Sequence, residues 1–292
     1  MLLAPFRKIL FPIDYSEPCQ AAAPYVKEML RHFSADLALV HSYGPEALAG
    51  SELALADPEL PAQVRILVEQ RVREFALETF PGEHVETIAE LGEPGGVIHK
   101  VVQHQGTDVV MLATHGRGPI RRLLQGSVAA KVLHDVSAAV WTATGSVFAG
   151  HKPGIPYTSV LCALNLGKGD EEEAEAVLKA DAAFAGGYKA RLSLVHVVET
   201  PRPNLAVDFS PYKKDLMDTA DFRLRELKGK LGIDAPHAVI DAEVPEGVRQ
   251  EAVRRNADLI ITGRGLAQAT FHALWSRLYP IVRESPCPVL SI

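Results

Sequence analysis

The stretch at residues 108–140, DVVMLATHGRGPIRRLLQGSVAAKVLHDVSAAV, decides the fold predicted for this chain. It opens with a short apolar run at 109–113, which has the length and composition of a strand buried on both faces. The run breaks into THGRGP at 114–119, where glycines allow backbone angles that other residues avoid. Nine residues separate Gly116 from Gly126, which opens a segment with helical spacing.

A strand, a glycine loop and a glycine-serine pair at a helix start form the layout of an anion-binding site. The free backbone N–H groups and the positive end of the helix dipole point toward a negative group there. Gly126 leaves room for a phosphate near the backbone, and Ser127 adds a hydroxyl donor. The alternative, a tight strand-to-helix turn that binds nothing, stays open at this point.

The spacing G-x-x-G, nine residues, G-S resembles the nucleotide-binding signature of the universal stress protein family. Here it reads ATHG at 113–116, nine residues, and GS at 126–127, so an alanine stands in place of the first glycine. The words that follow, VAAKVL at 128–133, also resemble that family. The methyl group of Ala113 is tolerable if φ is ordinary and awkward if φ is positive.

The composition bounds the class of protein. The 292 residues suit one large or two ordinary domains. The hydrophobic fraction of 47% and the charged fraction of 23% are those of a soluble globular protein. The net charge of -6, without a basic stripe, argues against nucleic acid as a partner. No apolar run approaches the roughly 20 residues of a membrane span, and the first residues lack the apolar core of a signal peptide, so we expect no membrane partner.

The cysteines and acidic residues indicate neither a disulfide framework nor a metal site. Cys19, Cys162 and Cys287 stand at unrelated spacings, which predicts reduced thiols and a cytoplasmic location. The acidic run at 170–173 is interpreted as the first turn of a helix, where carboxylates suit the helix dipole.

Strand patterns alternate with helix patterns along the first half, which predicts a parallel sheet covered by helices. The predicted strands are 9–14, 37–41, 85–91, 109–113 and 139–143. The resemblance implies the doubly wound strand order 3-2-1-4-5. A glycine- and proline-rich stretch at 145–156 is interpreted as a linker.

The plan repeats after the linker. VLCALN at 160–165 echoes ILFPID at 9–14, and residues 258–265 echo 108–116 with one deletion. We therefore predict two α/β domains, 1–150 and 155–292, each with a five-stranded sheet. The resemblance implies a tandem universal stress protein packed as an intramolecular pseudo-dimer through 139–143 and 289–292, with further homodimer formation left open.

The repeat allows the two halves to be compared with each other. Three substitutions fall on the proposed site of the second half: Trp275 for Gly126, Asn165 for Asp14, and Glu243 for Gly92. An indole cannot leave the room that a hydrogen leaves, and an amide lacks the charge of a carboxylate. We therefore expect only the first half to bind nucleotide.

The resemblance implies ATP as the ligand, with or without Mg2+, in the crevice beyond the strand ends. Asp14 would contact the nucleoside, although a carboxylate that bonds its own loop is an equal alternative. Pro12 and the backbone at Ser42 would border the base, and His115 and Arg117 would lie near the phosphates. The full set of expected ATP-binding residues is Pro12, Asp14, Ser42, Leu112, Ala113, His115, Gly116, Arg117, Gly126, Ser127 and Val128.

No catalytic constellation stands out in the sequence. His41 and His196 recur at a strand end of both halves, which favours a structural hydrogen bond. No base is placed to activate water, so ATP hydrolysis should be absent or very slow. We expect a nucleotide-responsive stress sensor or regulator. The alternative is a stress-protein scaffold with both crevices unoccupied.

Overall fold

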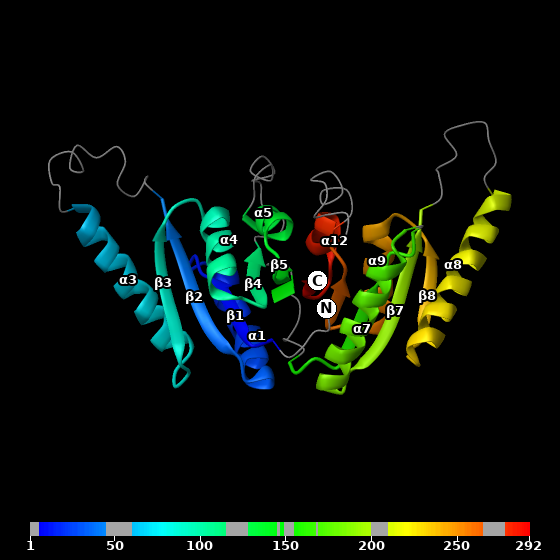
Figure 1. The fold of residues 1–292 in the computed structure, drawn as a ribbon, viewed down its shortest axis with the longest axis horizontal. Coiled ribbons are helices and arrows are strands. Elements are labelled where there is room, and N and C mark those ends of the chain that lie inside the picture. Colours follow the sequence, from blue (N-terminus) through cyan, green and yellow to red (C-terminus); the bar gives the residue numbers. More distant parts are fainter. Residues whose placement is uncertain are drawn as a thin grey trace. The chain divides into compact units, whose positions relative to one another are not determined.

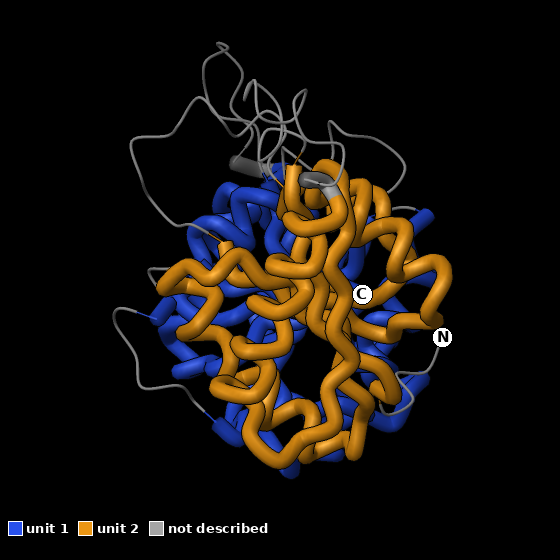
Figure 2. Tube along the Cα trace, turned by 90° about the vertical axis from the view of Figure 1, so that its left-hand side faces the viewer, with its two compact units in different colours: residues 1–4, 142–292 blue, residues 5–141 orange. Residues whose placement is uncertain are grey.

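The computed structural model describes residues 6–44, 60–114, 128–144, 147–148, 155–167, 169–199, 210–264 and 278–292. The chain divides into two compact units, one spanning Pro5–Trp141 and the other containing Thr142–Ile292 (Figure 2). Each unit is described by itself. Among the described residues, no helix combines the length and the apolar character needed to cross a lipid bilayer.

The first half alternates strands and helices as predicted (Figure 1). Its strands are β1 (Lys8–Pro12), β2 (Asp36–Tyr43), β3 (Val85–Leu91), β4 (Val109–Thr114) and β5 (Ala139–Thr144). Its helices are α1 (Glu17–Phe33), α3 (Leu60–Thr79), α4 (Pro94–Gln105) and α5 (Val128–Asp135). The strand order is β3-β2-β1-β4-β5, and β1 pairs in parallel with both β2 and β4, so the predicted 3-2-1-4-5 order is confirmed.

The second half repeats this plan, which confirms the predicted tandem. Its strands are β6 (Ser159–Ala163), β7 (Arg191–Val198), β8 (His237–Asp241), β9 (Leu259–Thr262) and β10 (Val289–Ser291). Its helices are α7 (Glu171–Tyr188), α8 (Ser210–Leu231), α9 (Val244–Arg255) and α12 (Tyr279–Glu284). The order β8-β7-β6-β9-β10 is again third, second, first, fourth, fifth.

The start of β4 and the start of β9 are fixed in the same way. The Asp108 carboxylate accepts the backbone N–H groups of Arg7 and Lys8, at 2.7 and 3.0 Å. In the second half, the Asp258 carboxylate accepts the N–H of Thr158 at 2.7 Å. In each half, these bonds join the start of the first strand to the start of the fourth strand. The first and fourth strands are the two that border the candidate site.

One correspondence expected from the sequence is wrong. Glu243 was expected opposite Gly92, but it is the N-cap of α9, as Glu93 is the N-cap of α4. The counterpart of Gly92 is Ala242, because both donate a backbone N–H to the end of the second strand of their half. The sequences EPGG at 93–96 and VPEG at 244–247 are similar, and matching them shifted the comparison of the two halves by one residue. The structure therefore removes this substitution from the second site.

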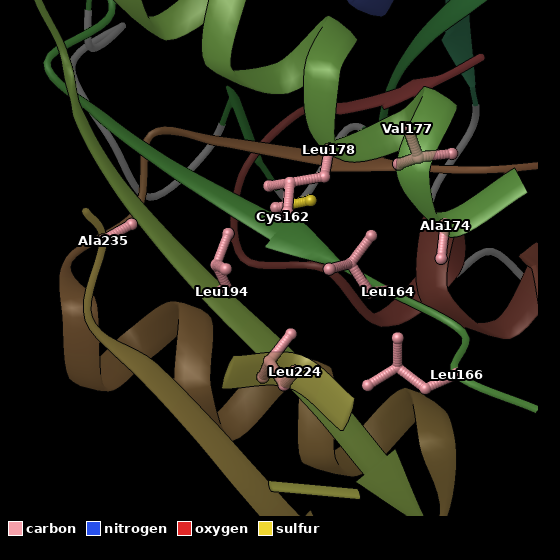
Figure 3. Packing of buried hydrophobic residues seen from close by; sticks show 9 residues of the cluster. All are labelled: Cys162, Leu164, Leu166, Ala174, Val177, Leu178, Leu194, Leu224 and Ala235. Atoms are coloured by element: carbon pink, nitrogen blue, oxygen red, sulfur yellow. The ribbon is translucent and has the colours of Figure 1, made fainter. Parts of the chain in front are cut away.

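A cluster of buried residues holds α7 and α8 against β6 and β7 (Figure 3). Its members, drawn in Figure 3, are Cys162, Leu164, Leu166, Ala174, Val177, Leu178, Leu194, Leu224 and Ala235. Leu164 and Leu166 belong to the loop that follows β6, so the cluster fixes the course of that loop. Burial of such side chains contributes roughly 1.5–3 kcal/mol each.

Candidate functional site

The candidate crevice lies beyond the carboxyl ends of β1 and β4. These strands are neighbours in the sheet, with Ile9 opposite Val109 and Leu10 opposite Val110. The chain leaves β1 for β2 on one side, whereas β4 lies on the other, so the strand order reverses here. Ligands of open parallel sheets bind at such a reversal.

The structure brings the described site residues to this end of the sheet. Pro12 is the last residue of β1 and lies opposite Val40 of β2, with Ser42 two residues farther along β2. Leu112 and Ala113 lie near the end of β4, and Val128 is the first residue of α5. The expected phosphate contacts His115, Gly116, Arg117, Gly126 and Ser127 lie outside the described residues, as do Trp275 and Ser276.

Asp14 is exposed and lies two residues beyond the end of β1. Its Oδ1 accepts the backbone N–H of Ser16 at 3.0 Å and the Ser16 hydroxyl at 2.6 Å. Ser16 Oγ in turn accepts the N–H of Cys19 at 3.3 Å and caps α1. The loop-bonding role of this carboxylate is therefore confirmed for Oδ1. Burial, and to a lesser degree a hydrogen bond to the Asp14 side chain, raises the pKa of the Cys19 thiol to about 11. Asp14 is nevertheless exposed, so a ligand can reach its carboxylate.

Tyr15, which the sequence comparison missed, braces this loop. It has a positive φ of 61°. Its ring lies 4.8 Å from that of His41 and 5.6 Å from that of Phe75, between centroids, and the Arg71 guanidinium lies 5.5 Å from its centroid. Burial raises the pKa of Tyr15 to about 12, so the phenol stays neutral. The sequence signal that could have indicated this role is an aromatic residue directly after the aspartate at the end of a strand.

The two recurring histidines hold the strand ends, as predicted. Nδ1 of His41 lies 2.8 Å from the carbonyl oxygen of Ile13. Nδ1 of His196 lies 2.9 Å from the carbonyl oxygen of Leu164. Because both rings make the same bond to backbone, their role is structural.

Ala113 adopts the ordinary backbone of a strand. It lies inside β4, and it is absent from the residues with positive φ among those described. The methyl group in place of the motif glycine is therefore tolerated.

The second half places a carboxylate near the equivalent strand end. Gly263, directly after β9, is the counterpart of Ala113. A Cβ on Gly263 would lie 2.5 Å from Oε1 of Glu173 and 2.9 Å from a methyl of Val177. Glu173 precedes the C-cap of α7 by as many residues as Pro18 precedes the C-cap of α1. The acid thus stands where the first half has a proline.

Asn165 is engaged within its own loop. Its Nδ2 donates to Oδ2 of Asp170 at 2.7 Å, and its Oδ1 accepts the N–H of Gly167 at 3.2 Å. The counterpart of the exposed Asp14 carboxylate is therefore an amide whose nitrogen already donates to another side chain.

The burial pattern of the last helices supports the proposed register of Trp275. Ala129, Val132 and Leu133 are buried in the first half, and Leu278, Ile281 and Val282 are buried at the same spacing in the second. Trp275 precedes Leu278 by three residues, as Gly126 precedes Ala129. Counting along the chain therefore pairs the indole with the glycine.

The described side chains at this end of the sheet offer hydrogen-bond acceptors and a braced loop. Within the described ranges, no three His, Cys, Asp or Glu side chains gather closely enough to hold a metal ion. The arrangement suits recognition of a polar ligand.

Comparisons with known proteins agree with this architecture. The chain matches the universal stress protein family twice, over residues 5–143 and 156–292. A universal stress protein of Thermus aquaticus is 33% identical over 130 residues, which cover 43% of this chain and 92% of that protein. A solved universal stress protein of Archaeoglobus fulgidus DSM 4304 has a TM-score of 0.69 at 19% identity, covering 97% of this chain and 95% of its own, and it supports the fold.

A further universal stress protein of Archaeoglobus fulgidus was solved in complex with dAMP. It is 17% identical, with 47% of this chain and 98% of its own covered, at a TM-score of 0.33. Its ligand is a property of that protein alone.

Proposed function

The chain belongs to the universal stress protein family, and we propose that it binds ATP in its first half only, as a nucleotide-responsive stress sensor or regulator. The observation that carries the proposal is the contrast between Asp14 and Asn165. Asp14 presents an exposed carboxylate that a ligand can reach, whereas the Asn165 amide is bonded to Asp170. The motif GS at 126–127, beside α5, supplies the expected phosphate contacts.

Two features of the second half support an empty crevice there. The Glu173 carboxylate lies close to Gly263 at the end of β9, where the first half has Pro18. Counted along the sequence from the buried residues of α12, Trp275 pairs with Gly126. A charged and a bulky side chain thus replace the small groups of the first site.

The finer features of the proposal follow from the same reading. The domains are 1–150 and 155–292 and form a pseudo-dimer, and Mg2+ accompanies ATP where the phosphates require it. The three cysteines are free and buried, which supports a reducing, cytoplasmic location. We expect ATP hydrolysis to be absent or very slow, because the sequence places no base to activate water.

Nucleotide released from the purified protein tests the proposal. We expect acid-denatured protein to release an adenine nucleotide, or the nucleotide-free protein to bind ATP in calorimetric titration. A protein that neither carries nor binds adenine nucleotide would instead be the scaffold, with both crevices unoccupied.

Asp14→Asn should weaken ATP binding by about ten- to a hundredfold. A charged acceptor contributes roughly 1.5–3 kcal/mol to a hydrogen bond, which corresponds to that range of affinity. The asparagine oxygen can still accept from Ser16, so the loop should keep its course. ATP and ADP should be affected alike, because Asp14 faces the nucleoside.

The matched control is Asp36→Asn, which removes the same charge from an exposed position at the start of β2. Its ATP affinity, measured by calorimetry, should stay within twofold of the wild type. Equal losses in both variants would mean that net charge, and not the Asp14 contact, sets the affinity.

A further inference from the structure

Glu93 ties together the starts of two helices in the first half. As the N-cap of α4, its carboxylate accepts the N–H groups of Gly95 and Gly96, each at 3.0 Å. Its Oε2 also lies 2.6 Å from Nζ of Lys131 in α5. Burial opposes ionisation of Glu93, but Lys131 and the two N–H groups hold its pKa below the usual value. The carboxylate is therefore charged and shared between α4 and α5.

The aliphatic part of the Lys131 side chain packs against the backbone of Gly95. A Cβ on Gly95 would stand 2.7 Å from Cδ of Lys131 and 3.1 Å from its Cγ. Any side chain at Gly95 would displace this stem. Glycine, lysine and glutamate thus form one contact, which we call the Glu93–Lys131 clamp.

The clamp acts on the helix that follows the phosphate motif. Val128, the first residue of α5, comes directly after Ser127, and Lys131 stands three residues farther on. Fixing Lys131 to the start of α4 therefore restrains the first turn of α5. The backbone N–H groups of that turn are among those expected to face the phosphates.

The second half lacks the glycine and the lysine of this clamp. Glu243 is the N-cap of α9 but does not cap it with its side chain. The counterpart of Gly95 is Pro245, by the alignment of α4 with α9. The counterpart of Lys131 is Pro280, by the alignment of α5 with α12, and proline carries no ammonium. The clamp is therefore confined to the half with the glycine-serine motif.

We propose that the Glu93–Lys131 clamp positions the phosphate-binding turn at the start of α5 and so raises the affinity of the first half for ATP. The inference rests on the proposed function. Lys131 and Glu93 are 41% and 52% exposed at their side chains, so water and salt weaken the pair. An exposed pair of this kind changes an equilibrium by up to about fivefold.

Lys131→Met tests the clamp, because it keeps the apolar stem and removes the ammonium. At low ionic strength, calorimetry should show ATP affinity about three- to fivefold below wild type. Lys131→Arg, which keeps the charge, should restore it to within twofold. The matched control Lys100→Met removes an equally exposed pair with Glu90, away from α5, and should leave the affinity within about 1.5-fold.

Amide hydrogen exchange in nucleotide-free protein separates the clamp from the site. Lys131→Met should speed exchange in residues 132–135, whose N–H groups bond to the carbonyl groups of the first turn of α5, and Lys100→Met should not. If the wild type binds ATP but Lys131→Met changes neither exchange nor affinity, the clamp is refuted and the proposed function stands. Faster exchange with unchanged affinity would refute the positioning role. If the wild type binds no ATP, the proposed function fails, and the clamp's role falls with it.

Discussion

Gly126→Trp is expected to abolish ATP binding in the first half, with a loss of more than about a hundredfold, while the protein stays folded. The substitution gives the first half the residue that the second half carries at Trp275. A glycine at a helix start lets a phosphate approach the backbone, and an indole would occupy that approach. Because we propose that Gly126 borders the crevice, and not the buried core, we expect the cost in stability to be small.

A matched control separates occlusion from a general effect of tryptophan. Gly186 in α7 is exposed, and a Cβ there would meet no atom within 4 Å. Gly186→Trp should therefore keep wild-type ATP affinity, with both variants giving wild-type far-ultraviolet circular dichroism. Unchanged affinity in a folded Gly126→Trp protein would remove the glycine-serine motif from the site.

Asp181→Val should stabilise the second unit, and by more at higher pH. Asp181 of α7 is fully buried, and no hydrogen-bond partner reaches either carboxyl oxygen within the described residues. The Cys162 thiol is the polar group beside it, and burial raises the pKa of Asp181 to about 8. The counterpart in α1, counted from the helix C-caps, is the buried Val26. Valine therefore fits the site in the same fold.

The direction with pH follows from proton binding. An unfolded aspartate loses its proton near pH 4, whereas the folded one keeps it until about pH 8. Between these values the folded state holds one more proton, so stability falls by about 1.4 kcal/mol per pH unit and stops falling above the folded pKa. Wild type is thus favoured at acid pH.

Urea unfolding at pH 5 and pH 7.5 measures this effect. The advantage of Asp181→Val over wild type should grow by about 3 kcal/mol between the two pH values. Asp181→Asn, which cannot ionise, should show the same loss of pH dependence with less gain in stability. An advantage that is equal at both pH values would mean that Asp181 does not keep its proton in the folded state.

Local patterns were enough to predict the fold. The apolar runs ending in Asp14 and Ala113, and their echoes in the second half, gave the strands, and the motif resemblance gave their order. The predicted structural role of His41 and His196 also needed only their repeated place at a strand end. These features depend on residues close together in the sequence.

Contacts between distant segments could not be predicted in this way. The Glu93–Lys131 pair joins two helices, and the Glu173 carboxylate meets Gly263 across the sheet end. The mistaken pairing of Glu243 with Gly92 arose because two similar words were matched without the helix caps that set their register. The loop contacts of Asp14 and of Asn165 likewise became distinct only with side chains in place.

The stoichiometry of nucleotide binding tests the central claim most directly. Calorimetric titration of the full chain with ATP should give one site per chain, because Asp14 and the glycine-serine motif occur in the first half only. We propose that Trp275 and Glu173 exclude the phosphates from the second half. One equivalent that disappears in Gly126→Trp is the predicted result. Two equivalents per chain, or one equivalent that survives Gly126→Trp, would contradict the account.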